Sequence, residues 1–360
     1  MEYRKLGHSG LIVSAVSLGT MQFGKAMNLG SLDQNATNAM VKSALDLGVN
    51  FIDTADVYSR GESETLIGNA LKGIRQNIVL ATKVRLPMSD TDFNHSGATR
   101  ANIRREIEDS LRRLQTDYVD LYQIHGWDKL TPIEETLRTL DDLVREGKVR
   151  YIGLSNYFAW QAAVALGIQH EEHLERFVTA QLYYSLVGRG LENGWMQFAE
   201  YADLGILVWS PLAGGYLSGK YKRGEKAPSD TRFGGSGQFV PFDEAQGERT
   251  LDVLRKVSER HQVSPARAAI AWTLGRPCVS SVIVAARTIP HLHDNIAAVD
   301  LKLSSEDLAE LDRVSDPGIP YPKWMVLQLN EGEDPRPKVL DPEKYKNGGP
   351  WQDLRVKKRW

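Results

Sequence analysis

The sequence is poor in cysteine, in net charge and in long apolar runs. Cys278 is the only cysteine among 360 residues, so the chain can form no intrachain disulfide. A formal net charge of −2 gives no electrostatic footprint for nucleic acid or for an anionic membrane. No uninterrupted apolar run approaches the ~20 residues that span a bilayer, and the start "MEYRKLGHSG" lacks the apolar core of a secretory signal. We therefore expect a cytoplasmic protein that binds neither nucleic acid nor membrane, and we leave open that it forms a homo-oligomer.

Short apolar runs alternate with helical patterns along most of the chain. Near-continuous apolar strands separated by helices are typical of a parallel sheet that helices cover. The predicted strands are residues 15–19, 50–53, 78–83, 119–125, 149–155, 178–182, 206–210 and 281–285. Apolar residues recur at helical spacing in residues 38–47, 64–71, 100–114, 133–146 and 195–204. These units predict an α/β fold, a (β/α)8 TIM barrel. An open doubly wound sheet is the alternative, but no G-x-G-x-x-G follows the first strand.

Three segments fall outside this alternation. Near the N-terminus, "YRKLGHSGLIV" predicts a β-hairpin. Residues 211–245 follow the seventh strand, are rich in glycine, and predict a long functional loop. Residues 316–360 hold seven of the fifteen prolines and three of the eight tryptophans. Disorder is one interpretation of so much proline, but tryptophans suit a packed surface better. We expect a barrel domain over 1–315 and a C-terminal extension over 316–360 that packs on the barrel and lines its substrate pocket.

Titratable residues gather where the predicted strands end. Asp53, Lys83 and His125 end three successive strands, and Tyr58 lies one loop beyond the second. The active site of a barrel of this kind lies at the carboxyl ends of its strands, here called the mouth. These four side chains are therefore expected to lie close together at the mouth of the barrel. Taken singly, each has an ordinary structural interpretation: a helix cap, a solvated charge or a core histidine.

The four side chains together make a proton donor. The proton of a free tyrosine, with a pKa near ~10, is hard to donate at neutral pH unless a cation such as Lys83 stabilises the phenolate. A buried lysine would lose its own proton, and Asp53 beside it would keep it charged. His125 is suited to orient a carbonyl oxygen or to relay the proton. A nucleophile triad fits less well because no G-x-S-x-G is present, and a metal site fits less well because Lys and Tyr are poor ligands.

Two segments then carry a family resemblance. "GVNFIDTADVYSRGESETLIG" and "KVRYIGLSNY" resemble the paired signature segments of the aldo-keto reductase superfamily, and the likeness extends over about residues 3 to 315. The resemblance implies reduction of an aldehyde or ketone with NADPH. It assigns Tyr58 as the acid, Lys83 and Asp53 as groups that tune it, and His125 as the residue that positions the substrate.

The resemblance also implies cofactor contacts along the strand ends. Ser155, Asn156 and Gln181 would bind the nicotinamide carboxamide, and Trp209 would stack on its ring. Arg287 would meet the 2′-phosphate, and Lys220 nearby favours NADP(H) because a 2′-hydroxyl needs no cation. The chain departs from the family pattern at Ala285, Ala286 and His291, which keeps NAD(H) open as a second cofactor. The full set of expected cofactor contacts is Gly19, Thr20, Met21, Asp53, Ser155, Asn156, Gln181, Trp209, Ser210, Pro211, Leu212, Gly214, Lys220, Ala285, Arg287, His291, Asp294 and Asn295.

The expected substrate is a small carbonyl compound of unstated identity. Its pocket is predicted to be apolar and aromatic, which suits a ring or alkyl ketone, a keto-sugar derivative or a xenobiotic carbonyl better than a carboxylate. The predicted lining residues are Met21, Phe23, Val57, Tyr58, His125, Trp127 and Trp324.

Other functions remain as alternatives. "GGYLSGKY" matches the pattern of a phosphate-binding loop, but Tyr221 replaces the magnesium-binding Ser or Thr. "HEEH" and "HLH" lack the spacing of a helical two-histidine zinc site, so we expect no metal ligand. A cofactor-sensing regulatory or channel-associated subunit with the same barrel is the alternative to an enzyme.

Overall fold

A computed structural model describes residues 1–25, 31–221 and 240–331 of the chain. The chain divides into two compact units, Met1–Asp316 and Pro317–Trp360, and each is treated by itself. Within the described residues, no helix combines the length and the apolar character needed to cross a membrane.

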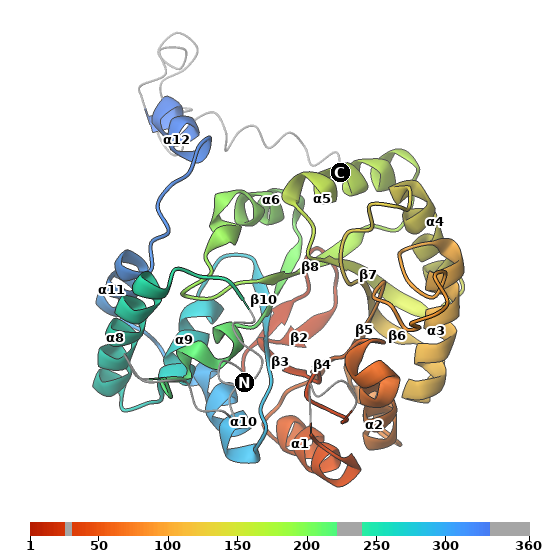
Figure 1. The fold of residues 1–360 in the computed structure, drawn as a ribbon, viewed down its shortest axis with the longest axis horizontal. Helices are drawn as coiled ribbons and strands as arrows, with labels where there is room; N and C mark the ends of the chain where they lie inside the picture. Colours follow the sequence, from red (N-terminus) through yellow and green to blue (C-terminus); the bar gives the residue numbers. More distant parts are fainter. Residues whose placement is uncertain (26–30, 222–239, 332–360) are drawn as a thin grey trace. The chain divides into compact units, whose positions relative to one another are not determined.

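The first unit is a closed barrel of parallel strands, drawn at the centre of Figure 1. The strands follow one another around the barrel in chain order, and β10 closes it by pairing with β3. The barrel strands are β3 (Val16–Gly19), β4 (Phe51–Asp53), β5 (Val79–Val84), β6 (Val119–Ile124), β7 (Val149–Ser155), β8 (Phe177–Tyr183), β9 (Gly205–Trp209) and β10 (Val279–Val284). The predicted (β/α)8 TIM barrel is confirmed, and each predicted strand lies within two residues of an observed one.

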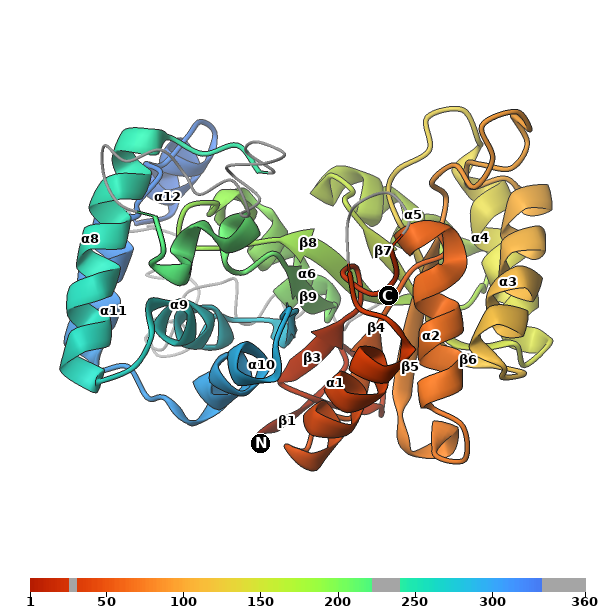
Figure 2. The same ribbon diagram turned by 60° about the horizontal axis from the view of Figure 1, so that its bottom comes forward.

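Helices surround the barrel on its outer side (Figures 1 and 2). The helices predicted from spacing are observed as α1 (Gln34–Asp46), α2 (Glu62–Ala70), α3 (Arg100–Leu114), α4 (Ile133–Arg145) and α6 (Trp195–Ala202). The helices that spacing did not predict are α5 (Ala159–Glu171), α8 (Glu244–His261), α9 (Pro265–Leu274), α10 (Ile289–Ile296) and α11 (Ser305–Val314). The main apolar core lies between this ring of helices and the strands.

The predicted N-terminal hairpin is confirmed as β1 (Tyr3–Lys5) and β2 (Ile12–Ser14). Leu6 in its turn is fully buried and packs with Phe51 and Leu121 in a second apolar cluster. Gly7 has a φ of +57°, and a Cβ there would lie 2.2 Å from the carbonyl oxygen of Val178. The hairpin therefore packs against the amino ends of the barrel strands, opposite the end where the predicted site lies.

Side-chain caps fix where several helices begin. Thr99 accepts a hydrogen bond from the Asn102 amide at the start of α3, and Ser264 does the same for α9, which begins at Pro265. Such caps satisfy amides that have no partner within the helix. The Thr99 cap therefore fixes where the loop after β5 ends and α3 begins, and the Ser264 cap fixes the junction between α8 and α9.

The last helix of the first unit packs along α8, and the two run side by side in Figure 2. Asp307 on α11 accepts hydrogen bonds from Arg260 and His261 at the end of α8. These contacts and those of Ser304 lower the pKa of the Asp307 carboxyl against the opposing effect of burial. Of the pair, α8 also packs against α9, the helix that contacts the last strand, β10.

The second unit contains one described helix, α12 (Lys323–Glu331). Within it the rings of Tyr321 and Trp324 lie 6.1 Å apart. The expectation that residues 316–360 pack on the barrel and line its pocket stays a prediction. Residues 222–239 of the predicted long loop and residues 332–360 of the extension lie outside the described part of the chain.

Candidate active site

The structure brings the four predicted side chains to the carboxyl end of the barrel. Asp53 is the last residue of β4, Lys83 lies near the end of β5, and His125 directly follows β6. Tyr58 begins a short 3-10 turn, Tyr58–Gly61, after β4. Because neighbouring parallel strands end at one edge, side chains far apart in the sequence meet here.

Lys83 links two of the other three side chains. Its Nζ donates to Asp53 Oδ1 at 2.6 Å and to the carbonyl oxygen of Thr54 at 2.8 Å. It also donates to Tyr58 Oη at 3.2 Å. The side chains of Lys83 and Asp53 are 0% and 2% exposed, so the ion pair is shielded from water. An ammonium held in this way can stabilise negative charge on the phenol oxygen.

Burial and the neighbouring charges of opposite sign act in opposite directions on the pKa values of Lys83 and Tyr58. Burial alone would lower the pKa of Lys83, but the Asp53 carboxylate and the Tyr58 hydroxyl raise it above its usual value. Burial and the Asp53 charge raise the pKa of the Tyr58 phenol, while the Lys83 cation lowers it in part. The lysine therefore stays charged at neutral pH and the tyrosine keeps its proton.

The imidazole of His125 faces the Tyr58 ring edge to face, with 5.9 Å between the ring centroids. Burial and the nearby cations of Lys83 and Arg85 lower the pKa of His125 well below its usual value. Its buried Nδ1 has no hydrogen-bond partner among the described residues. The ring is therefore neutral at physiological pH and can donate or accept one hydrogen bond toward a bound molecule.

Backbone strain marks the turn that carries Tyr58. Ser59 and Arg60, the next two residues, have φ values of 49° and 54°. Such left-handed conformations cost energy in residues other than glycine and collect at functional sites. Arg60 in turn pairs with Asp90 of the next loop, at 2.9 Å.

Two buried glutamines complete the surroundings of Asp53. Gln181 Nε2 donates to Asp53 Oδ2 at 2.7 Å, and Gln123 Nε2 donates to the same oxygen at 3.2 Å. Gln181 was expected at the cofactor, whereas Gln123 was not singled out in the sequence. The sequence could have indicated Gln123, because it lies two residues before His125 and side chains two residues apart point to the same face of a strand.

Asn156, expected at the nicotinamide, links two strand ends. Its Nδ2 donates to the carbonyl oxygen of His125 and to Ser155 Oγ, both at 3.0 Å, and its Oδ1 accepts from Trp209 Nε1 at 3.0 Å. The Trp209 ring is partly exposed and lies 5.1 Å from the ring of Tyr183, which the sequence interpretation missed. These contacts fix the side of the barrel mouth next to Asp53, Tyr58, Lys83 and His125, which are called the tetrad below.

The other residues expected at the cofactor lie at the end of β3 and just after it, in the segment after β9, and in the loop after β10 and the helix α10. Thr20 is buried and accepts a hydrogen bond from Ser63. Ser210 Oγ accepts from the Gly214 amide at 2.9 Å. Arg287 and His291 are exposed. The remaining positions in this set are Gly19, Met21, Pro211, Leu212, Lys220, Ala285 and Asn295.

Asp294, expected near the adenine, is engaged by the protein itself. Its Oδ1 accepts from Arg267 Nη2 at 2.8 Å, and its Oδ2 contacts the hydroxyl of Ser264. An adenine contact by Asp294 would have to share these oxygens.

The residues expected to line the substrate pocket differ in how much of each is exposed. Phe23 is 1% exposed and belongs to the apolar core, while Met21, Val57 and Trp127 are partly exposed. The Trp127 ring lies 5.1 Å from that of Tyr157 and 6.2 Å from that of Trp160. Both partners were missed in the sequence; Tyr157 is buried behind Trp127, whereas Trp160 is exposed beside it.

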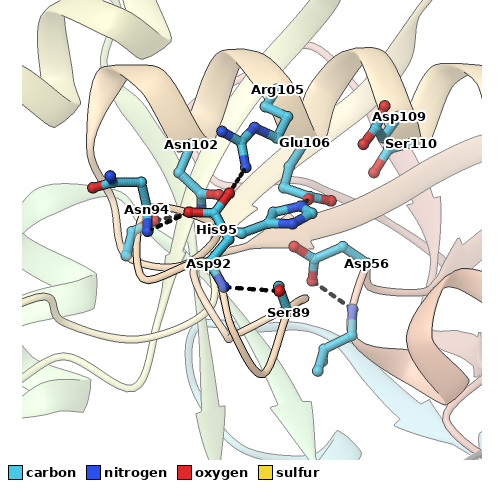
Figure 3. A network of polar contacts seen from close by, with 12 residues as sticks. Asp56, Ser89, Asp92, Asn94, His95, Asn102, Arg105, Glu106, Asp109 and Ser110 are labelled. Carbon is cyan, nitrogen blue, oxygen red and sulfur yellow. Dashed lines mark hydrogen bonds and ion pairs between the residues drawn. The ribbon is translucent and has the colours of Figure 1, made fainter.

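A cluster of buried acids consists of Asp56 in the loop after β4, Glu64 on α2 and Glu106 on α3, and Figure 3 shows Asp56 and Glu106. Glu64 and Glu106 are fully buried, and both accept from Arg113, at 2.6 and 3.3 Å. Asp56 is also fully buried; its Oδ1 accepts from the Val57 amide at 2.6 Å, and its Oδ2 has no partner among the described residues. Burial and the charges of Glu64 and Glu106 raise the pKa of Asp56 well above its usual value. Its burial therefore favours the protonated form of Asp56.

His95 joins this cluster from the loop after β5 (Figure 3). Its Nε2 contacts Glu106, and His95, Glu106 and Asp109 bring ligand-type atoms within 4.8 Å of one another. Arg113 already pairs with Glu106, and Arg112 pairs with Asp109 at 2.7 Å. Because protein cations balance these carboxylates, the cluster serves to anchor the loop, and the expectation of no metal ligand stays a prediction.

Comparisons with known proteins agree with this geometry. The model of the Aldo/keto reductase family matches residues 15–316. The chain is 37% identical to "Uncharacterized oxidoreductase YrpG" of Bacillus subtilis over 87% of this chain and 96% of that protein. It is 34% identical to "Protein tas" of Escherichia coli over 87% of this chain and 97% of that protein. It is 30% identical to "Versiconal hemiacetal acetate reductase" of Aspergillus parasiticus over 89% and 99%. The chain therefore belongs to the aldo-keto reductase family and is an NAD(P)H-dependent oxidoreductase that acts on carbonyl groups.

Proposed function

We propose that this enzyme reduces an aldehyde or ketone to the alcohol with NADPH, reversibly, and that Tyr58 supplies the proton. One observation carries the proposal. A buried ammonium, Lys83 Nζ, lies 2.6 Å from Asp53 Oδ1 and 3.2 Å from Tyr58 Oη. A cation held charged beside a phenol stabilises the phenolate that forms when the tyrosine gives up its proton.

The residues at the mouth suit a nicotinamide. When bound, the reduced nicotinamide supplies a hydride to the carbonyl carbon. The partly exposed rings of Trp209 and Tyr183 offer a flat apolar face for its ring. Ser155, Asn156 and Gln181 offer amide and hydroxyl groups for its carboxamide. These residues would hold the nicotinamide at the mouth of the barrel, where Tyr58 lies.

The protein's own groups then handle the charge that develops on oxygen. His125, neutral and beside the Tyr58 ring, would donate a hydrogen bond to the carbonyl oxygen and orient it. As hydride reaches the carbon, the π electron pair moves to the oxygen, which takes the proton from Tyr58 Oη. The phenolate left behind is stabilised by Lys83, whose own charge is held by Asp53. The proton returns from water after the alcohol leaves.

Arg287 and Lys220 favour NADPH over NADH. Both are exposed cations on the loops after β10 and β9. A guanidinium binds a 2′-phosphate through two hydrogen bonds, whereas a 2′-hydroxyl gains little from a cation.

An apolar or aromatic carbonyl is the proposed substrate class. The partly exposed ring of Trp127, two residues after His125, contacts the exposed ring of Trp160 and is backed by the buried ring of Tyr157. Such a surface contributes affinity for flat apolar groups and none for a carboxylate.

A panel of carbonyl compounds tests the proposal: sugars, terpenoid and steroid ketones, and aromatic aldehydes, each with NADPH and with NADH. We expect multiple turnovers with NADPH, fastest with aromatic aldehydes, and loss of turnover in Tyr58→Phe. A protein that binds NADPH but oxidises it only once per molecule, whatever the carbonyl, would be a cofactor-sensing subunit instead.

A further inference from the structure

Gln123 is a fully buried polar residue that the proposed mechanism does not use. It lies on β6 at the height of the tetrad, where it pairs in register with Lys83 on one side and Gly153 on the other. Its amide touches both Asp53 and Gln181. A buried amide costs stability unless its hydrogen bonds are made, so the contacts of Gln123 indicate its role.

The hydrogen bonds among these three residues have only one consistent arrangement. A carboxylate can only accept, so Gln123 and Gln181 must both turn their NH2 groups toward Asp53 Oδ2. Their Nε2 atoms lie 3.2 and 2.7 Å from that oxygen. Gln123 Oε1 is then left facing Gln181 and accepts its second N–H at 3.3 Å. Both N–H groups of the Gln181 side chain therefore donate within this group of three residues. Its side-chain oxygen, Oε1, remains to accept a hydrogen bond from a donor other than Asp53 and Gln123.

The neighbouring strand leaves room for this arrangement. A Cβ on Gly153 would lie 3.2 Å from Gln123 Cγ and 2.3 Å from Thr179 Oγ1. A side chain at this position would therefore clash with Thr179 and crowd Gln123.

We propose that Gln123 is a positioning residue that locks Gln181 with its oxygen toward the nicotinamide carboxamide and holds Asp53 against Lys83. The inference rests on the proposed function, because it takes Gln181 as the carboxamide ligand. Through this link the cofactor and the proton donor share one hydrogen-bonded chain: carboxamide, Gln181, Asp53, Lys83, Tyr58. A glutamine that merely filled the barrel would leave cofactor binding and the proton donor independent of its amide.

Two substitutions separate these roles. Gln123→Leu keeps the approximate volume and removes both hydrogen bonds. Gln123→Glu keeps the shape but presents an acceptor to Asp53 when ionised and a donor when protonated. Gln169→Leu is the matched control, because Gln169 is a buried glutamine of α5 whose Oε1 accepts from the Phe177 amide outside the site. Thermal unfolding of all three variants shows which of them fold.

For Gln123→Leu we expect NADPH to bind about 3- to 10-fold more weakly and kcat to fall about 10-fold, the scale of one lost hydrogen bond to a charged group. The uncompensated Asp53 charge should also raise the pKa of Tyr58, so the alkaline limb of the reduction profile should move to higher pH. Gln123→Glu should approach wild-type turnover at low pH and lose it as pH rises, since only the protonated acid can donate to Asp53. Gln169→Leu should change stability alone.

The inference is overturned if Gln123→Leu keeps the wild-type NADPH dissociation constant and alkaline limb, or if Gln123→Glu shows the wild-type pH profile. Either folded variant is sufficient for this decision. Failure of the proposed function is distinct, because it would appear in the wild-type protein as binding of NADPH without turnover of any carbonyl.

Discussion

The ammonium nitrogen of Lys83 lies 3.2 Å from the hydroxyl oxygen of Tyr58, although 25 residues separate them in the chain. Tyr58 lies in the turn after β4 and Lys83 lies near the end of β5. Because β4 and β5 are neighbours in the barrel, their register sets the distance between the two side chains. The roles of the Tyr58 hydroxyl and the Lys83 ammonium can therefore be tested separately by substitution.

Tyr58→Phe removes the hydroxyl and leaves the ring beside His125. We expect kcat for reduction to fall by ~10² to 10⁴, the usual cost of losing a positioned general acid, with little change in the NADPH dissociation constant. Steady-state kinetics with an unactivated ketone and fluorescence titration of NADPH measure the two quantities. Tyr201→Phe, at an exposed position of α6, is the control. If Tyr58→Phe keeps more than about a tenth of the wild-type kcat while chemistry limits the rate, Tyr58 is not the acid.

Lys83→Met replaces the ammonium by a neutral side chain of similar length. Because the Lys83 cation lowers the pKa of Tyr58, its loss should raise that pKa further. In the direction of alcohol oxidation, where the phenolate is the base, activity should then begin to rise only at a higher pH than in the wild type. Lys83→Arg keeps a positive charge and should leave this limb nearer its original place. A limb that does not move in Lys83→Met would show that the lysine does not act on the phenol.

The barrel could be predicted from the sequence because its strands are short apolar runs with polar residues at their ends. Helices α5 and α9 could not, for opposite reasons. Trp160 and Val164 are exposed apolar residues that obscure the period of α5, whereas α9 is buried on most sides and has no clear polar face.

The tetrad was accessible to sequence reasoning because each member ends a strand or begins the next loop. The surroundings of Asp53 were not. Gln181 reaches Asp53 across 128 residues, a contact that exists only because the barrel closes with this stagger. The pairing of Asp294 with Arg267 was equally hidden, since it joins two helices whose packing no local pattern specifies.

Arg287→Ala tests the preference for NADPH. If Arg287 meets the 2′-phosphate, the substitution should weaken NADPH binding by about 1.5 to 3 kcal/mol, the scale of a charge-assisted hydrogen bond, and leave NADH nearly unchanged. Titration of tryptophan fluorescence with each cofactor measures both constants. Arg249→Ala, at an exposed position of α8, should change neither. Equal losses for the two cofactors would remove Arg287 from this role.

Asp56 offers a prediction about stability. Burial beside Glu64 and Glu106 raises its pKa well above the usual value, so the folded protein binds a proton here that the unfolded chain releases. Stability from this group is therefore fully present below the unfolded pKa of ~3.9 and is lost as pH rises through the folded pKa. Asp56→Asn removes the titration and keeps the shape of the side chain.

We expect Asp56→Asn to be at least as stable as the wild type at pH 8, with an advantage that shrinks toward pH 5. Thermal unfolding across that pH range measures the difference. Asp46→Asn is the control, because Asp46 is an exposed partner of Lys42 on α1 and its loss should cost at most ~1 kcal/mol at any pH. A variant that is less stable than the wild type by the same amount from pH 5 to pH 8 would mean that Asp56 is ionised in the fold, beside the two other buried carboxylates of Glu64 and Glu106.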